Sequence, residues 1–321
     1  MAILVFVEIE DKSVKTSSIE ALCYGVSVAG QTGQEVQVVT YGEIDTESLA
    51  QLGAYGAAKV LHCQSTQLNE NATVQGVSTL IANAFKEVQA NTLVMARSSM
   101  VDALASRVGI KVGASVVTNV VSLPDTANGF TVKRSIFTGK AFADVQLPEG
   151  NRVITIKKNT VPVEKGEGSA EVVDLNTDFA SDDFAVSKLS EEKAEGEVLL
   201  PEADIVVSGG RGLKGPENWG MVEELAKLLG AATACSKPVS DMEWRPHHEH
   251  VGQTGIKISP NLYIAIGISG AIQHLAGVNS SKVIVVVNKD AEAPFFKAAD
   301  YGIVGDAFDV VPKLIEAFKA Q

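Results

Sequence analysis

The stretch YIAIGISGAIQHLAG at residues 263–277 decides the fold of the C-terminal half of the chain. Its first four residues form an apolar run typical of a buried strand, and Gly267, Ser269 and Gly270 then supply turn residues. From Ala271 onward, apolar and small residues return at helical spacing. A buried strand that passes through a glycine turn into a helix is half of a β-α-β unit, so the stretch predicts an α/β fold.

The same rhythm extends through most of the chain. In the C-terminal half, β-branched strand-like runs at 203–207, 263–266 and 282–287 alternate with helical patterns at 218–229 and from 271. In the N-terminal half, runs at 3–7, 35–40, 59–63 and 91–95 alternate with helical patterns at 16–29 and 73–88. Continuous apolar strands are expected where helices cover both faces, so we expect a doubly wound, mostly parallel sheet in the N-terminal half and a second α/β domain in the C-terminal half.

The pattern changes near residue 115. Four strand-like runs at 115–123, 130–136, 140–145 and 152–157 are separated by turn residues such as Asn128-Gly129 and Pro124-Asp125. This spacing is typical of hairpins, so we expect an antiparallel extension of the N-terminal sheet.

The charge is concentrated in one segment. The 321 residues carry a net charge of -12, and residues 163–204 hold 13 acidic against 3 basic side chains. Apolar residues are sparse there, which predicts a linker or a strand-and-loop crossing between domains. We therefore expect an N-terminal domain over 1–190, ending in an acidic connector from 163, and a C-terminal domain over 191–321. An acidic chain also argues against nucleic-acid binding, which needs a basic face.

No segment predicts export or a membrane span. The N-terminus has a short apolar run without a basic leader, and no apolar run approaches about 18–20 residues. The three cysteines lack C-x-x-C spacing, so neither a disulfide framework nor a zinc site is predicted. A cytoplasmic location fits these observations best.

Several loops after the C-terminal strands carry polar and glycine residues. They are SGGRG at 208–212, CSKP at 235–238, VGQTG at 251–255, NKD at 288–290 and a loop at 302–306. Ligands of α/β sheets bind at the carboxyl ends of strands, although ordinary turns explain each loop equally well when it is taken alone. Neither G-x-G-x-x-G nor a P-loop is present, which disfavours standard NAD binding and P-loop chemistry.

Two further motifs resemble catalytic or metal-binding patterns but depart from them. The sequence G-I-S-G-A has Ala271 where a nucleophile elbow needs glycine, so a serine hydrolase is not predicted. The run His247, His248, Glu249, His250 follows Pro246 without a helix to fix its spacing, and it is interpreted as a solvated turn rather than a metal site.

Taken together, VGQTG at 251–255, YIAIGISGAIQHLAG at 263–277, NKD at 288–290 and DYGIVGD at 300–306 closely resemble the α subunit of electron-transfer flavoprotein. The resemblance covers most of residues 203–318, and it is looser in the N-terminal half, where it includes the turn Gly139-Lys140-Ala141. It implies a heterodimer whose β subunit contacts the N-terminal domain, FAD held mainly by the C-terminal domain, and AMP in the partner β subunit.

The resemblance also implies which residues bind the cofactor; no catalytic or metal-ligating residue is expected. The implied cofactor-binding residues are Arg211, Ser236, Lys237, Val251, Gly252, Gln253, Thr254, Gly267, Ser269, Gly270, Gln273, His274, Asn288, Asp290 and Asp306. It puts Arg211 over the flavin or its phosphates and Ser236 near the flavin and pyrophosphate. Gln253 and Thr254 are expected near the isoalloxazine, with Thr254 close to N5.

The remaining roles follow the same resemblance. Ser269, Gly270 and Gln273 are expected along the pyrophosphate and ribityl path, and His274 is expected to donate to the flavin O2. The adenosine end is assigned to Asn288 and Asp306.

Lys237 departs from the family pattern, since many members have arginine in this turn. Lysine keeps the positive charge that favours an anionic reduced flavin but loses the planar fork of arginine.

The function implied is an electron carrier rather than an enzyme. FAD would take electrons from flavin dehydrogenases, such as the acyl-CoA dehydrogenases of fatty acid β-oxidation, and pass them through the semiquinone to a membrane quinone oxidoreductase or another acceptor. Two alternatives stay open on the residues alone: an NAD-binding enzyme of a related α/β fold, and a structural or sensor module that binds adenine nucleotides.

Overall fold

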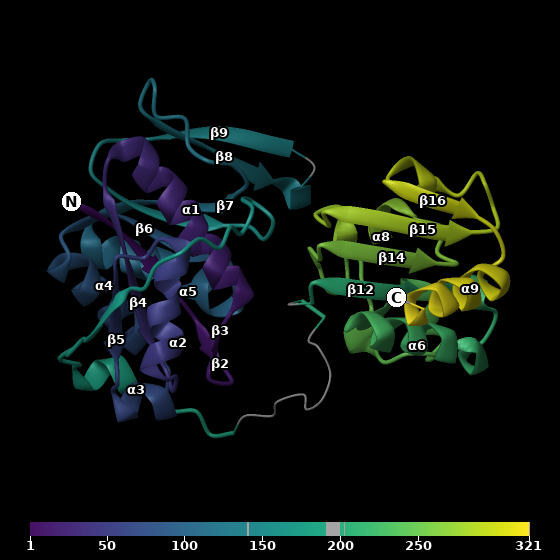
Figure 1. The fold of residues 1–321 in the computed structure, drawn as a ribbon, viewed down its shortest axis with the longest axis horizontal. Coiled ribbons are helices and arrows are strands. Elements are labelled where there is room, and N and C mark those ends of the chain that lie inside the picture. Colours follow the sequence, from purple (N-terminus) through teal and green to yellow (C-terminus); the bar gives the residue numbers. More distant parts are fainter. Residues whose placement is uncertain (140, 191–199, 202, 321) are drawn as a thin grey trace. The chain divides into compact units, whose positions relative to one another are not determined.

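The structure is a computed structural model that describes residues 1–139, 141–190, 200–201 and 203–320. The chain divides into two compact units, residues 1–191 and 192–321, and each is described by itself (Figure 1). The domain boundary predicted at 190/191 adjoins residues 191–199, which lie outside the described residues, so it stays a prediction. Lys140, expected to begin a strand and to form part of a family-like turn, also lies outside them.

The first unit is built on a sheet of nine strands in the order β11-β5-β4-β1-β6-β10-β7-β8-β9. The strands are β1 (Ala2–Phe6), β4 (Glu35–Tyr41), β5 (Lys59–Cys63), β6 (Ala90–Ala96), β7 (Ala114–Val120), β8 (Phe130–Ile136), β9 (Ala141–Leu147), β10 (Asn151–Ile156) and β11 (Glu171–Asp174). The strands β2 (Ile9–Glu10) and β3 (Ser13–Val14) form a separate hairpin. The helices are α1 (Thr16–Thr32), α2 (Thr46–Ala50), α3 (Thr66–Glu70), α4 (Val74–Glu87) and α5 (Ser99–Val112).

Central strand β1 illustrates why its sequence is apolar throughout. Ile3 and Val5 pack in a core that includes Leu22 of α1, whereas Leu4 and Phe6 pack in the opposite core with residues of α4 and α5. Because side chains alternate across the sheet, a strand covered on both faces buries every residue. The predicted doubly wound, mostly parallel sheet is confirmed.

The antiparallel extension is smaller than expected. β8 pairs antiparallel with β7 and β9, but β10 inserts between β6 and β7 and is parallel to both. The burial patterns explain the difference. Residues 153–156 of β10 are buried in succession, as in a central strand, whereas β9 alternates exposed and half-buried residues along most of its length, as in a strand with one free face.

The acidic segment is more than a linker. Its β11 pairs in parallel with β5 at the edge of the large sheet. Ala170 and Leu175, which flank this strand, are buried in the cores of the first unit. A few apolar residues at strand spacing are therefore enough to fold this part of the segment onto the sheet.

The second unit has a wholly parallel sheet in the order β13-β12-β14-β15-β16. Its elements are β12 (Ile205–Gly209), α6 (Gly220–Leu229), β13 (Ala232–Cys235), α7 (Lys237–Asp241), β14 (Leu262–Ile266), α8 (Ile272–Val278), β15 (Val283–Asn288), β16 (Tyr301–Val304) and α9 (Ala307–Lys319). Residues of α6 and α9 share one core, and Val278 of α8 lies in the other.

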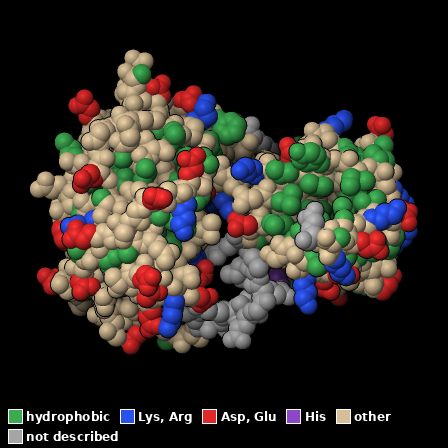
Figure 2. All heavy atoms as spheres, in the orientation of Figure 1, with side chains coloured by type: hydrophobic (Ala, Val, Ile, Leu, Met, Phe, Trp, Pro, Cys, Tyr) green, Lys and Arg blue, Asp and Glu red, His purple; other side chains and the backbone are tan. Residues whose placement is uncertain are grey.

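The loop expected at 302–306 is mostly strand. Tyr301–Val304 form β16, which pairs with β15 and ends the sheet. Both faces of β16 are exposed, so it lacks the buried apolar pattern by which the other strands were predicted. Figure 2 shows hydrophobic side chains gathered over the region of β14, β15 and β16.

Candidate functional site

The strand order of the second unit creates a switch point at its carboxyl edge. From β12 the chain passes to β13 on one side and then returns to β14 on the other. The loops that follow β12 and β14 therefore diverge to opposite faces of the sheet, and ligands of open α/β sheets bind in the crevice that this leaves.

Glycines join the two loops at the switch point. The backbone N–H of Gly210 donates to the Ile266 carbonyl at 2.8 Å, and that of Gly212 donates to the Gly267 carbonyl at 3.0 Å. A Cβ on Gly212 would lie 2.7 Å from Cα of Gly267, which itself has a φ of 63°. Only glycine allows this backbone-to-backbone approach. The SGGRG motif is therefore part of the frame of the site.

A second pair of backbones joins VGQTG to helix α8. The N–H of Gln253 donates to the Gln273 carbonyl at 2.7 Å, and a Cβ on Gly277 would lie 2.5 Å from the backbone nitrogen of Gly252. The side chains of Gln253, Thr254 and Gln273 remain exposed beside this contact. The structure thus brings together a loop and a helix whose contacting residues are 20 or more positions apart in the sequence.

Helix α8 contributes a buried histidine. His274 is 7% exposed, and its Nε2 lies 2.8 Å from the hydroxyl of Tyr263 on β14. Its Nδ1 is buried, and the backbone of Val251 lies near the ring. Burial, aided by nearby His250, lowers the pKa of His274 to about 4, so the imidazole is neutral at physiological pH.

The carboxyl end of β13 carries the predicted Ser236 and Lys237. Ser236 is buried and precedes α7, and its backbone N–H donates to the Gly209 carbonyl at 3.1 Å. Lys237 is exposed and forms an ion pair of 2.8 Å with Asp241 one turn later. Arg211, in the loop after β12, is also exposed. Two cationic side chains therefore flank the switch point.

The end of β15 and the loops beyond β15 and β16 hold three more predicted side chains in local contacts. Asn288 donates through Nδ2 to the Ile268 carbonyl at 2.9 Å, and its Oδ1 accepts from the N–H of Asp290 at 3.0 Å. Asp306 caps helix α9, since its Oδ1 accepts from the N–H of Phe308 at 3.0 Å. Oδ1 of Asp290 accepts from the N–H of Glu292 at 3.0 Å. The three side chains therefore stabilise their own loops, and their cofactor-binding role stays a prediction.

The other predicted residues complete the edge. Val251 is buried and its N–H donates to the Cys235 carbonyl at 3.0 Å. The carbonyl of Ser269 accepts from the N–H of Phe295 at 3.1 Å. Gly270 has a φ of 79°, and a Cβ there would lie 2.5 Å from that of Phe295. Asn288 is the last residue of β15, and the other fourteen predicted residues lie in loops of this unit or in the first turns of its helices.

Two residues at this edge were missed from the sequence. Tyr263 lies inside an apolar strand run, where nothing distinguishes a packed phenol from a positioned one. His250 was interpreted as part of a solvated turn, yet it is 2% exposed and its Nδ1 has no partner among the described residues. Burial, with His247 nearby, lowers the pKa of His250. Its position directly before VGQTG was the available signal.

No metal-binding group is found in the described parts of the chain: nowhere in them do three or more His, Cys, Asp or Glu side chains gather as metal ligands would. Cys23, Cys63 and Cys235 are free and buried. None of the described helices is long and apolar enough to cross a membrane.

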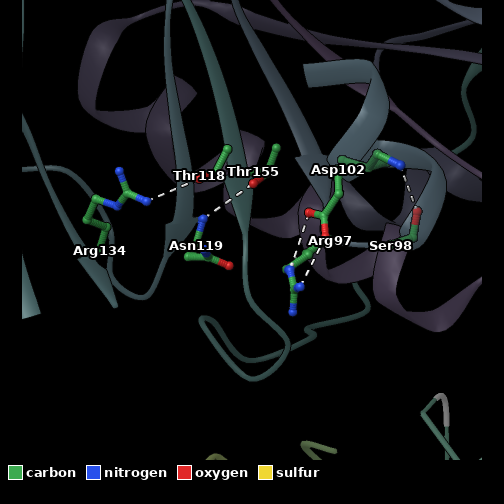
Figure 3. Close-up of polar contacts among 8 residues, drawn as sticks. Arg97, Ser98, Asp102, Thr118, Asn119, Arg134 and Thr155 are labelled. Carbon is green, nitrogen blue, oxygen red and sulfur yellow. Dashed lines mark hydrogen bonds and ion pairs between the residues drawn. The ribbon is translucent and has the colours of Figure 1, made fainter. Parts of the chain in front are cut away.

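The first unit has a polar cluster of its own at the carboxyl ends of β6, β7 and β10. Figure 3 shows Arg97 paired with Asp102 of α5, and Arg134 donating to Thr118. The Arg97–Asp102 ion pair measures 3.0 Å, and Asp102 lies in the first turn of the helix, where a carboxylate already offsets the helix dipole. Nε of Arg134 is buried without a hydrogen-bond partner among the described residues. The candidate site remains the carboxyl edge of the second unit's sheet.

The residues of that edge fit a flavin dinucleotide. The close backbone contacts at Gly212 and Gly267 leave no room for a Cβ, which suits a pyrophosphate held against the backbone. The exposed cations Arg211 and Lys237 and the neutral imidazole of His274 suit the charged and polar groups of a flavin dinucleotide. The fold and site define a nucleotide- or flavin-binding α/β domain.

Comparison with known proteins identifies the family. Residues 3–180 match the family model described as "Electron transfer flavoprotein domain", and residues 199–279 match "Electron transfer flavoprotein FAD-binding domain". The chain is 36% identical over 323 residues to "Electron transfer flavoprotein subunit alpha" of Bacillus subtilis, covering 99% of this chain and 97% of the relative. It is 37% identical to the proteins of that name from Syntrophomonas wolfei, over 98% of both chains, and Mycobacterium tuberculosis, over 99% of this chain and 98% of the relative. The chain belongs to the electron transfer flavoprotein family, as an α subunit, and contains its FAD-binding domain.

Proposed function

We propose that this chain carries FAD on its second unit and transfers electrons between protein partners, without substrate chemistry of its own. The observation that carries the proposal is the coincidence of two findings. The FAD-binding family match over 199–279 spans the loops after β12, β13 and β14, where the switch point lies. The alternative of an NAD-binding enzyme is not favoured, because this match is to a flavin domain.

FAD, when bound, supplies the redox chemistry by accepting and releasing electrons. The chain supplies the environment. His274 would offer a neutral polar edge to the ring system, and the joined loops at Gly212 and Gly267 would hold the backbone close to the pyrophosphate. The exposed side chains of Arg211 and Lys237 would place positive charge at the rim of the site, where it favours added negative charge.

The partners proposed are those that the family implies. A β subunit would contact the first unit and hold AMP, flavin dehydrogenases such as those of fatty acid oxidation would donate electrons, and a membrane quinone oxidoreductase or another acceptor would receive them. A cytoplasmic location is part of the same proposal. Transient docking of this kind suits a carrier, because affinity for each partner must remain low enough for release.

The test is cofactor content. The chain coexpressed with its β subunit is expected to purify yellow, with a flavin absorption band, and to release FAD on denaturation. A colourless complex that binds NAD would overturn the proposal.

A matched pair of variants locates the site. Arg211→Ala is expected to weaken FAD binding. Lys227→Ala removes another exposed positive charge, from the last turn of α6. This helix leads back to the opposite edge of the sheet, so the variant is expected to leave FAD binding unchanged. Equal effects of the two variants would place FAD elsewhere.

A further inference from the structure

A cavity of about 610 Å³ lies in the first unit, at the edge of the sheet opposite to Arg97. Its walls come from the start of β8 and of β10, the end of β9 and the last residue of α1, and β9 is the terminal strand of the sheet (Figure 1). The cavity has the size of known small-molecule sites, which measure about 300–1,000 Å³. Its lining residues include Phe130, Leu147, Pro148, Glu149 and Arg152.

Among the described residues that line the cavity, Arg152 alone is positively charged. It is half-buried, and its guanidinium carbon lies 4.5 Å from the centroid of the Phe130 ring. Its Nε is buried, and no residue that the structure describes accepts a hydrogen bond from this guanidinium or forms an ion pair with it. The aromatic ring attracts the charge, but it offers no oxygen or nitrogen to the five N–H donors of a guanidinium.

The other half-buried arginines of the described chain each donate to a side chain. Arg245 forms an ion pair with Glu249, and Arg134 donates to the Thr118 hydroxyl at 3.3 Å. Arg152 has no such acceptor within the described residues, although its Nε is closed off from solvent. Burying an unpaired guanidinium destabilises a fold, and an acceptor that enters through the cavity would remove this destabilisation.

The other lining residues select the kind of anion. A guanidinium binds carboxylates and phosphates, because either can accept two of its N–H groups. Phe130 and Leu147, which are buried, and Pro148 add apolar surface beside the charge. Glu149 is exposed and also lines the cavity, so it would repel a second negative charge on the ligand. A ligand with one carboxylate and an apolar body fits these conditions, whereas a phosphate group with two negative charges does not.

We propose that this cavity is a binding site for a small monocarboxylate with an apolar body. The carboxylate accepts hydrogen bonds from the guanidinium of Arg152, and the apolar body lies against Phe130, Leu147 and Pro148. The site belongs to the first unit alone, and it does not depend on whether FAD binds to the second unit as proposed above.

The arginine Nε–H signals in NMR spectra test the proposal directly. The full chain is labelled with 15N arginine, purified in complex with its unlabelled β subunit, and titrated with sodium benzoate at constant ionic strength. The chain has six arginines, and Arg152→Lys identifies the signal of Arg152 by its loss. We expect benzoate to shift this signal to saturation and to leave the signals of the other arginines nearly unchanged.

A matched pair of variants measures what the guanidinium contributes. Arg152→Met keeps an unbranched side chain beside Phe130 but removes the charge and the N–H donors, so benzoate is expected to bind at least about tenfold more weakly. Arg107→Met removes an exposed arginine of α5, and it should leave the affinity for benzoate unchanged. Isothermal titration calorimetry of the same complexes gives the dissociation constants.

Three results would overturn the proposal. The first is a titration in which benzoate shifts no Nε–H signal of the wild-type complex to saturation, and this result needs no variant to fold. The second is an equal loss of benzoate affinity in Arg152→Met and Arg107→Met. The third is inorganic phosphate that binds as tightly as benzoate, which contradicts the class of ligand. A complex that lacks flavin but binds benzoate through Arg152 supports this proposal and overturns only the proposed function.

Discussion

Replacing Gly277 by alanine tests whether the site depends on the close contact between α8 and the VGQTG loop. A Cβ on Gly277 would lie 2.5 Å from the backbone nitrogen of Gly252 and 2.6 Å from its Cα. Both neighbours are backbone atoms, so no side chain can rotate to make room. The helix and the loop must move apart by about 1 Å to restore an ordinary contact distance.

Two effects of opposite sign set the size of the change. Forcing a methyl group into a packed contact costs about 1–3 kcal/mol. Alanine in place of glycine within a helix stabilises the helix by up to about 1 kcal/mol. We therefore expect the second unit to lose about 1–2 kcal/mol of stability. Because α8 carries His274 and the loop carries Thr254, we also expect FAD to bind about tenfold more weakly.

Tryptophan fluorescence during urea unfolding measures the first effect. Both tryptophans, Trp219 and Trp244, lie in the second unit, so the signal reports that unit alone. The control is Gly220→Ala at the start of α6, where a Cβ meets nothing within 4 Å and stability should be unchanged or slightly higher. If Gly277→Ala matches Gly220→Ala in both stability and FAD affinity, the close contact is not what shapes the site.

Three further predictions concern charge. Lys237→Ala should lower the first reduction potential of the bound flavin by at most about 40 mV, because an exposed charge contributes about 1 kcal/mol or less. A redox titration that finds no shift contradicts this prediction. Glu249→Gln should destabilise the second unit by about 2–4 kcal/mol in urea unfolding, because Glu249 is buried and paired with Arg245 at 2.5 Å. Glu223 pairs with the same arginine but is exposed, so Glu223→Gln should destabilise the unit by under about 1 kcal/mol. The pKa of His274 falls from 6.5 to about 4 on folding, so the unfolded chain binds more protons between those pH values. The free energy of unfolding should therefore drop by up to about 3 kcal/mol as the pH falls from 6.5 to 4. His274→Gln should flatten this pH dependence.

The sequence predicted the elements whose burial was regular. β5 and β8 begin and end at the predicted residues, because β-branched runs bounded by turns leave little freedom. It did not predict the parallel placement of β10, since strand order depends on which neighbours complete the core and not on the strand itself. β16 was missed because none of its residues is buried.

The site was predictable where glycines and polar residues follow strands in a recognisable order. The backbone-to-backbone contacts at Gly212 and Gly277 were not predictable, because they join segments that are distant in the sequence. The local bonds of Asn288 and Asp306 could not be predicted either, because residue identity alone does not show whether a polar side chain caps a helix or binds a ligand. Tyr263 illustrates the limit most clearly, since its partner lies 11 residues away on another element.

The terminal strand β16 has a practical consequence for handling the protein. Within the described chain no strand pairs with its outer side, and Tyr301 and Val304 are 67% and 60% exposed. A free row of backbone donors and acceptors beside exposed apolar side chains is a template for joining a second extended chain. Preparations of this polypeptide by itself are therefore expected to self-associate as concentration rises, and a lysine substituted for Val304 is the simplest change to improve its solubility.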